Sequence, residues 1–144
     1  MKKLLIACAA VLLCLGLLLG GMLLFGRVTI TAQEKIYPVG TEEITVVWRN
    51  WTAKSMFYGE PFSLEAWVGG EWVPMEPVND LLFYLPAYGL LPGLNQKITY
   101  STGFYYGPLQ AGRYRIAANY HYESEVPISE ATPRHDVYAE FEVK

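Results

Sequence analysis

Residues 106–120, Tyr-Gly-Pro-Leu-Gln-Ala-Gly-Arg-Tyr-Arg-Ile-Ala-Ala-Asn-Tyr, have the pattern of a tight corner that leads into a long β-strand. Gly and Pro residues interrupt regular structure in the first half of the stretch. After Gly112, alternate residues point to opposite faces, and the face that we expect to be buried is the more apolar one. Its residues are Tyr114, Ile116, Ala118 and Tyr120.

Leu109, Gly112 and Tyr114 have the spacing of a tyrosine corner, a structural feature in which a strand tyrosine bonds back to the preceding loop of a β-sandwich. We therefore expect the Tyr114 hydroxyl to bond a backbone group within residues 109–111. We also expect Gly112 to take a backbone shape that a Cβ would resist. The strand that follows this corner should lie centrally, with other strands around it.

Short strands with turn signals between them recur along the chain. We expect strands near 28–37, 43–51, 61–68, 71–74, 96–101, 112–120 and 136–144, a short apolar run at 81–85, and a two-residue Gly69-Gly70 hairpin turn. The pattern predicts an all-β, antiparallel β-sandwich over residues 28–144. Its core should include Trp48, Leu64, Tyr114, Ile116 and Phe141, and the inner face of the third strand should carry Phe62, Leu64, Ala66 and Val68.

The N-terminal segment, residues 1–27, has a different character. Leu4 to Phe25 contains 22 residues and no charge, which corresponds to about 33 Å of helix against a hydrocarbon core of about 30 Å. We predict an uncleaved transmembrane anchor, with Lys2 and Lys3 in the cytoplasm and residues 28–144 outside the plasma membrane. A cleaved signal peptide is the alternative, although no A-x-A-like site ends the run. Cys8 follows too short an apolar run for a lipobox.

Charge and cysteine content exclude several classes of function for the predicted exported part. Both cysteines, Cys8 and Cys14, lie in the N-terminal segment, so residues 28–144 contain neither a disulfide nor a thiol nucleophile. Beyond Arg27 there are 14 acidic and 8 basic residues, a formal charge of −6. This balance argues against nucleic acid and anionic lipid as general partners of the domain.

Five short motifs occur in order: residues 58–65 (Tyr-Gly-Glu-Pro-Phe-Ser-Leu-Glu), 70–74 (Gly-Glu-Trp-Val-Pro), 91–93 (Leu-Pro-Gly), 106–109 (Tyr-Gly-Pro-Leu) and 112–116 (Gly-Arg-Tyr-Arg-Ile). Over residues 37–120 the chain resembles the bacterial immunoglobulin-like domains of Gram-positive, clostridial-type exported proteins. The resemblance implies a sandwich of about seven strands and no catalytic residues. This chain departs from the family at residues 103–105, where Asp-Trp is expected, and at residues 117–119, where a basic residue is expected.

No catalytic, cofactor or metal motif is present in the sequence. His121, His135, Glu123, Glu125 and Glu130 could be imagined as metal ligands, but they lack motif spacing such as H-E-x-x-H. Because Glu60 and Glu65 lie on opposite faces of a strand, they are a poor acid–base pair. Glu65 is better placed to pair with Arg49 or Arg115. Asn50-Trp51-Thr52 matches a glycosylation sequon. We therefore predict no enzyme activity, no cofactor and no metal.

Aromatic residues are the unusual feature, since 20 of the 21 follow Arg27. Four of them fall off the inward pattern and are candidates for surface binding: Trp67, Tyr105, Tyr122 and Tyr138. We predict an extracellular interaction domain whose partner is an envelope protein or the cell wall. Two alternatives stay open: a module that binds glycan or wall polymer through an aromatic groove, and a proteinase inhibitor that uses a protruding loop, at residues 86–95 or 124–135.

Overall fold

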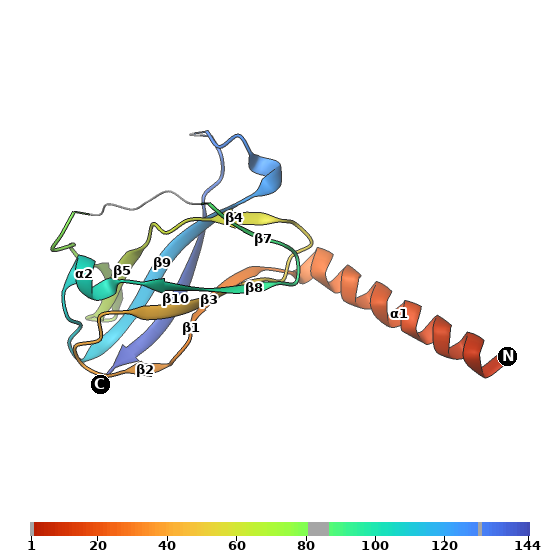
Figure 1. Cartoon of the computed structure of the whole chain (residues 1–144), viewed down its shortest axis with the longest axis horizontal. Helices are drawn as coiled ribbons and strands as arrows, with labels where there is room; N and C mark the ends of the chain where they lie inside the picture. Colours follow the sequence, from red (N-terminus) through yellow and green to blue (C-terminus); the bar gives the residue numbers. More distant parts are fainter. Residues whose placement is uncertain (1, 81–86, 130) are drawn as a thin grey trace.

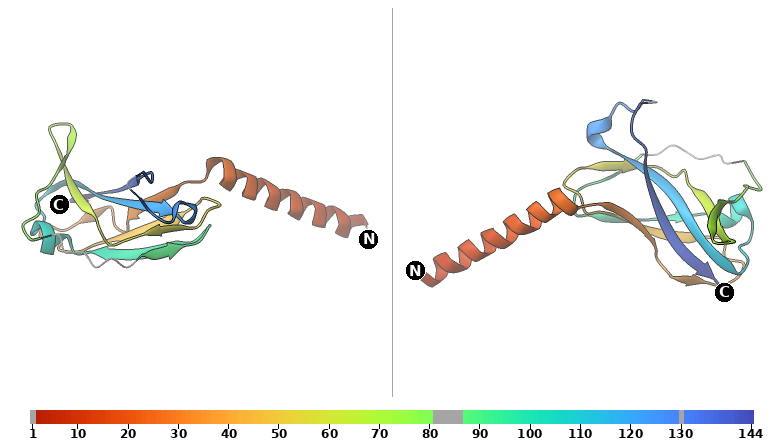
Figure 2. Two further views of the ribbon diagram at one scale, coloured as in Figure 1. Left: turned by 90° about the horizontal axis from the view of Figure 1, so that it is seen from above. Right: turned by 180° about the vertical axis from the view of Figure 1, so that it is seen from behind.

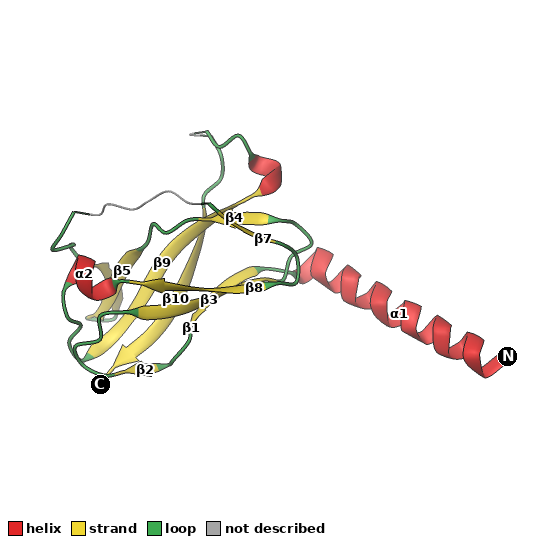
Figure 3. Cartoon of the chain, viewed as in Figure 1, coloured by secondary structure: helices red, strands yellow, loops and turns green. Residues whose placement is uncertain are grey.

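The computed structural model describes residues 2–80, 87–129 and 131–144, and within the N-terminal helix it describes the side chains of residues 6–21. Helix α1 (Lys2–Phe25) projects from one end of a β-sandwich (Figures 1 and 3). The strands are β1 (Val28–Ala32), β2 (Ile36–Tyr37), β3 (Ile44–Asn50), β4 (Met56–Tyr58), β5 (Ser63–Val68), β6 (Glu71–Pro74), β7 (Tyr88–Leu90), β8 (Asn95–Tyr100), β9 (Gly112–Tyr122) and β10 (His135–Val143). The short helices are α2 (Thr102–Tyr106) and η1 (Glu123–Glu125).

Strand β9 is the central strand of the larger sheet, as its alternation predicts. One edge of β9 pairs with β10 along nine residue pairs, from Gly112–Val143 to Tyr120–His135. The other edge is shared: β5 pairs with residues 114–117, and β4 pairs with residues 120–122. The smaller sheet has the order β1-β3-β8 and packs across the core from β9. The predicted antiparallel sandwich is therefore confirmed for most of its strand pairs.

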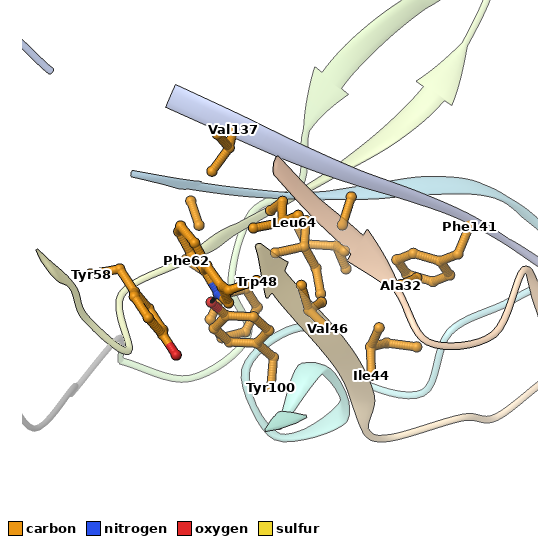
Figure 4. Packing of buried hydrophobic residues seen from close by; sticks show 14 of the residues in the cluster. Ala32, Ile44, Val46, Trp48, Tyr58, Phe62, Leu64, Tyr100, Val137 and Phe141 are labelled. Atoms are coloured by element: carbon orange, nitrogen blue, oxygen red, sulfur yellow. Dashed lines mark hydrogen bonds between the residues drawn. The ribbon is translucent and has the colours of Figure 1, made fainter. Parts of the chain in front are cut away.

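The core lies between the two sheets and is rich in aromatic side chains (Figure 4). Trp48 is fully buried, stacks on Tyr58 at 4.1 Å between ring centroids, and donates a hydrogen bond from Nε1 to the Tyr100 hydroxyl at 3.3 Å. Because the indole N–H has an acceptor, Trp48 can be buried without leaving an unsatisfied hydrogen-bond donor in the core. The five residues predicted to form the core are all buried: Trp48, Leu64, Tyr114, Ile116 and Phe141.

Three features differ from the expectations. Val68 is 59% exposed rather than inward, because β5 leaves the sandwich there to form a hairpin with β6. The first strand divides in two, and β2 pairs with β10 in parallel in the other sheet. Residues 102–106 form the helix α2, which sits close to the loop between β2 and β3. A Cβ at Gly103 would lie 2.6–2.7 Å from atoms of Glu42, so this contact requires glycine. The expected run at 81–85 is outside the described residues.

Within the described residues, no helix is both long and apolar enough to cross a membrane. The membrane-spanning role predicted for Leu4 to Phe25 is therefore not supported by this observation.

Candidate interaction surface

The corner before β9 is internal to the fold. The Tyr114 hydroxyl donates to the Gln110 carbonyl oxygen at 2.9 Å, an acceptor within the 109–111 segment, and Leu109 is 1% exposed. Burial raises the pKa of Tyr114. The expectation for Gly112 needs correction, because this residue does not have a positive φ. Instead the Tyr114 side chain occupies the space beside it, with ring and hydroxyl atoms 3.2–3.4 Å from where a Cβ would lie.

The four aromatic residues singled out from the sequence do not form one patch. Trp67 and Tyr138 are exposed by 38% and 44% on the outer face of the larger sheet. Tyr105 and Tyr122 are partly buried against the core at other places. Tyr105 contacts the ring of Phe62 in the region of α2, and Tyr122 is the last residue of β9. Only Trp67 and Tyr138 therefore remain as candidates for a shared surface.

Between Trp67 and Tyr138 lies a continuous row of stacked side chains, which we name the Trp–Arg strip. It consists of Tyr138, Arg115, Trp72, Arg113 and Trp67. The Arg115 guanidinium lies 4.0 Å from the Tyr138 ring centroid and 4.7 Å from that of Trp72. Arg113 lies 5.2 Å from the Trp67 centroid, and the two indoles meet edge to face at 5.0 Å. Such cation–π contacts hold a flat surface together.

Strand register explains how this strip forms. In a two-residue hairpin, the residues on either side of the turn face each other in pairs, and Trp67 pairs directly with Trp72. Glu65 pairs with Arg115 on the neighbouring strand, and Tyr138 pairs with Ala117. Trp72 was not singled out from the sequence, although the symmetry about Gly69-Gly70 was enough to place it opposite Trp67 and on the same face.

The two arginines of the strip differ in how firmly they are held. Arg115 Nε donates to Glu65 Oε2 at 2.6 Å, and both side chains are largely buried, at 20% and 14% exposure. This is one of the pairings expected for Glu65. Arg113 is about half exposed and lies 3.4 Å from Glu140 Oε2. Arg115 is thus fixed as part of the surface, whereas Arg113 is more exposed and makes a longer contact with its carboxylate partner.

The hairpin of β5 and β6 extends this surface beyond the sandwich, where it is the yellow-green projection in the left panel of Figure 2. Val68 and Val73 on this hairpin are 59% and 44% exposed. Because Val73 pairs with Ala66 and Val68 with Glu71, both valines lie on the face of the hairpin opposite Trp67 and Trp72. Exposed apolar groups that lie next to one another on a soluble domain commonly mark interaction sites.

The residues imagined as metal ligands are only partly brought together. His135 Nε2 lies 2.8 Å from Glu125 Oε1, while His121 Nδ1 is 4.0 Å from Glu125 Oε2. The hydrogen bonds from His135 and from the Tyr122 backbone lower the pKa of Glu125. Among the residues that the structure describes, no group of three His, Cys, Asp or Glu side chains could hold a metal ion. Glu130 lies outside the described residues.

The asparagine of the glycosylation sequon is buried in the folded domain. Asn50 has no exposed surface, and its side-chain nitrogen donates to the carbonyl oxygens of Lys54 at 2.7 Å and Leu90 at 3.0 Å. The Thr52 hydroxyl donates to Asn50 Oδ1 at 2.6 Å. Because every polar atom of the Asn50 amide is engaged inside the protein, the residue is structural in the folded domain.

Comparisons with solved structures give weak likenesses. The CARDB domain of a Pyrococcus furiosus protein, solved in complex with di-metal ions, is 16% identical over 83% of this chain and 94% of that chain, with a TM-score of 0.36. Bacillus subtilis Spo0M, a sporulation control protein, is 11% identical over 83% and 49%, with a TM-score of 0.38. A Listeria innocua β-glucosidase is 15% identical over 83% of this chain but only 16% of the enzyme, with a TM-score of 0.36. Likeness at this level carries no argument about function.

Comparison with sequences is more informative. A search of curated proteins found no significant match. The profile of the bacterial Ig-like domain family matches residues 26–142, and domains of this family are generally non-catalytic. The match does not single out Gram-positive or clostridial members. Since it covers most of the chain, including both sheets and the Trp–Arg strip, the protein belongs to the bacterial Ig-like domain family.

Proposed function

We propose that this protein is a non-catalytic interaction module on the outer side of the bacterial plasma membrane, where α1 anchors it and the Trp–Arg strip binds another envelope protein. The observation that carries the proposal is the strip itself. Tryptophan, tyrosine and arginine are the residues that most often dominate binding at protein interfaces. Here they are adjacent and pre-ordered, with Trp67, Tyr138 and Arg113 exposed and the other two members partly exposed.

Pre-ordering supports binding because fewer side chains lose freedom when a partner arrives. Arg115 is held by Glu65, and its guanidinium lies over both Trp72 and Tyr138. The Trp67 and Trp72 rings also restrict each other. The partner therefore meets a pre-ordered aromatic surface, and a carboxylate of the partner would compete with Glu140 for the more exposed Arg113.

Anchoring by α1 is supported by sequence and exposure. Leu4 to Phe25 contains no charge, and its large apolar side chains within residues 6–21 are exposed, for example Leu12 by 69% and Leu17 by 69%. A helix that is apolar on all sides requires an apolar environment around it. The two lysines before the segment and the single arginine after it favour an orientation with the Ig-like domain outside the cell.

Capture from native membranes tests the role of the strip. The bait is the full chain in mild detergent, compared with the double variant Trp67→Ala/Trp72→Ala. Phe104→Ala is the matched control, because Phe104 is 61% exposed outside the strip. We expect one envelope protein to be retained by the wild type and the control and lost from the double variant. Equal retention by all three baits would contradict the proposal.

The two alternatives predict other outcomes. A glycan-binding module would retain purified wall polymer rather than protein, through the same exposed rings. A proteinase inhibitor would use a loop, and residues 124–129 and 131–134 do rise above the sandwich in Figure 1. Substitutions in the strip would leave inhibition unchanged. The double variant therefore separates an inhibitor from the two binding functions, and the retained ligand, protein or wall polymer, separates those two.

A further inference from the structure

A second exposed apolar surface lies at the end of the sandwich from which α1 leaves. Its apolar members are Trp51, Leu91 and Leu94, exposed by 48%, 58% and 52%. Arg27 and Lys54, both exposed, lie on the same chain segments. We name this surface the apron. It comprises the loop after β3, the turn between β7 and β8, and the residue that joins α1 to β1.

Backbone hydrogen bonds place these three segments side by side. The Trp51 amide donates to the Arg27 carbonyl oxygen at 3.1 Å, next to the start of β1. The Asn50 amide donates to Leu94 at 3.0 Å, and Gly93 donates back to Asn50 at 2.7 Å. A backbone hydrogen bond therefore joins the apron directly to Arg27, two residues after the end of α1.

The turn that presents the two leucines follows from the Leu-Pro-Gly motif. The Leu94 amide donates to the Leu91 carbonyl oxygen at 3.2 Å, and Gly93 between them has a φ of +75°. Proline followed by a residue with positive φ is the pattern of a type II turn, which needs glycine at that place. The turn brings the ends of the four-residue segment together, so Leu91 and Leu94 lie on one small surface.

Asn50 fixes the direction of Trp51. Its buried side chain binds Lys54 and Leu90 through the nitrogen and Thr52 through the oxygen. With the residues on both sides turned inward, the intervening Trp51 must point outward. Breaking the hydrogen bonds of a buried side-chain amide costs free energy. The Asn50 amide therefore holds the exposed Trp51 in a fixed position.

We infer that the apron docks on the lipid headgroup region of the membrane beside α1, an inference that rests on the proposed anchoring. Tryptophan prefers this interfacial region, and leucines on a turn can enter its apolar edge. Residues 51–55 and 91–95 contain no acidic residue, although the domain as a whole is acidic. Arg27 then lies where anionic headgroups attract cations, while Lys54 at the edge of the apron is turned over the Tyr122 ring, 5.1 Å from its centroid.

Fluorescence quenching by brominated lipid tests the apron. The full chain is reconstituted into phosphatidylcholine–phosphatidylglycerol vesicles whose acyl chains are brominated near the headgroup, and into unbrominated vesicles. Positions 1–27 contain no tryptophan, so insertion of α1 alone produces no quenching. We expect brominated lipid to quench roughly a quarter of the emission, since Trp51 is one of four tryptophans.

Matched variants assign the signal. Trp51→Tyr should abolish the quenching, whereas Trp67→Tyr, an exposed tryptophan of the hairpin, should leave the quenched emission unchanged. Leu91→Ser/Leu94→Ser should reduce the quenching of Trp51, and Val68→Ser/Val73→Ser should not. These four variants change exposed side chains and so spare the core.

Vesicle flotation separates the two ways in which the inference can fail. Protein that floats with the vesicles but is not quenched, or is still quenched after Trp51→Tyr, overturns the apron while anchoring stands. Floating protein without quenching would leave the apron to a protein partner or a second copy, whereas quenching that survives Trp51→Tyr would place another tryptophan at the lipid. Protein that does not float overturns the proposed anchoring and the apron with it.

Discussion

Tyr114 shows how one side chain stabilises the corner through two separate interactions. Its hydroxyl donates to Gln110, and its ring packs against Phe141 and beside Gly112. Removing a neutral hydrogen bond costs about 0.5–1.5 kcal/mol, and truncating a buried aromatic ring costs about 3–5 kcal/mol. We therefore expect Tyr114→Phe to be mildly destabilising and Tyr114→Ala severely so, in urea unfolding of the full chain in mild detergent. An unchanged midpoint for Tyr114→Phe, together with lost partner binding, would make the corner a binding site instead.

Ionisation of Tyr100 should lower the free energy of unfolding at alkaline pH. Burial, the largest influence, raises its pKa from 10.0 to about 12. A raised pKa means that the folded protein holds the proton more tightly than the unfolded chain, so the contribution is complete below pH 10 and is lost as the pH rises to 12. The loss should be about 2–3 kcal/mol. Unfolding measured at pH 9 and pH 12 should show a smaller difference in Tyr100→Phe. An equal difference would mean that other groups cause the effect.

Single residues could be predicted from the sequence when only chain geometry was needed. The alternation around Ile116 and the spacing of Tyr114 place both residues without knowledge of the partners. Gly112 and Asn50 could not be interpreted in this way. The role of Gly112 depends on where a ring two residues later lies, and the role of Asn50 depends on carbonyl groups of Lys54 and Leu90 that only the folded chain brings near.

At the scale of elements, β9 gives a direct test of the assigned faces. Ile116 on β9 has no exposed surface, so Ile116→Ala should cost about 2–5 kcal/mol in the free energy of unfolding. Val73→Ala is the control, because Val73 is 44% exposed on β6 and its truncation should stay within about 0.5 kcal/mol. Comparable losses in the two variants would show that the inner and outer faces are assigned incorrectly.

Elements also show where local patterns stop being informative. Alternation identifies the two faces of a strand but not the sheet to which it belongs, so the parallel pairing of β2 with β10 was missed. Five residues are too few for a helical period, which hid α2. The hairpin was predicted from Gly69-Gly70, whose φ values are +62° and +93°, but its projection beyond the sandwich was not. That projection is why Val68 is exposed and why the Trp–Arg strip extends so far.

At the scale of the whole molecule, the proposed anchor and the strip belong to different ends. Helix α1 leaves one end of the sandwich, whereas β5 and its hairpin lie toward the other (Figures 1 and 2). We expect the full-length chain to fractionate with membranes and to resist carbonate extraction, because a spanning apolar helix is not removed by high pH. Recovery from the culture medium of a chain that starts within residues 21–28 would instead indicate a cleaved signal peptide.

The attachment of α1 to β1 also determines how the domain responds to mechanical load. A partner held at the hairpin would pull β5 and β9, while the membrane would retain Val28 at the start of β1. Strand β1 pairs with β3 from Val28–Asn50 to Ala32–Val46. Hydrogen bonds between antiparallel strands lie perpendicular to them, so tension along β1 loads the bonds of this ladder together rather than one after another. Such a shear geometry favours slow unfolding under a force applied between the hairpin and the start of β1.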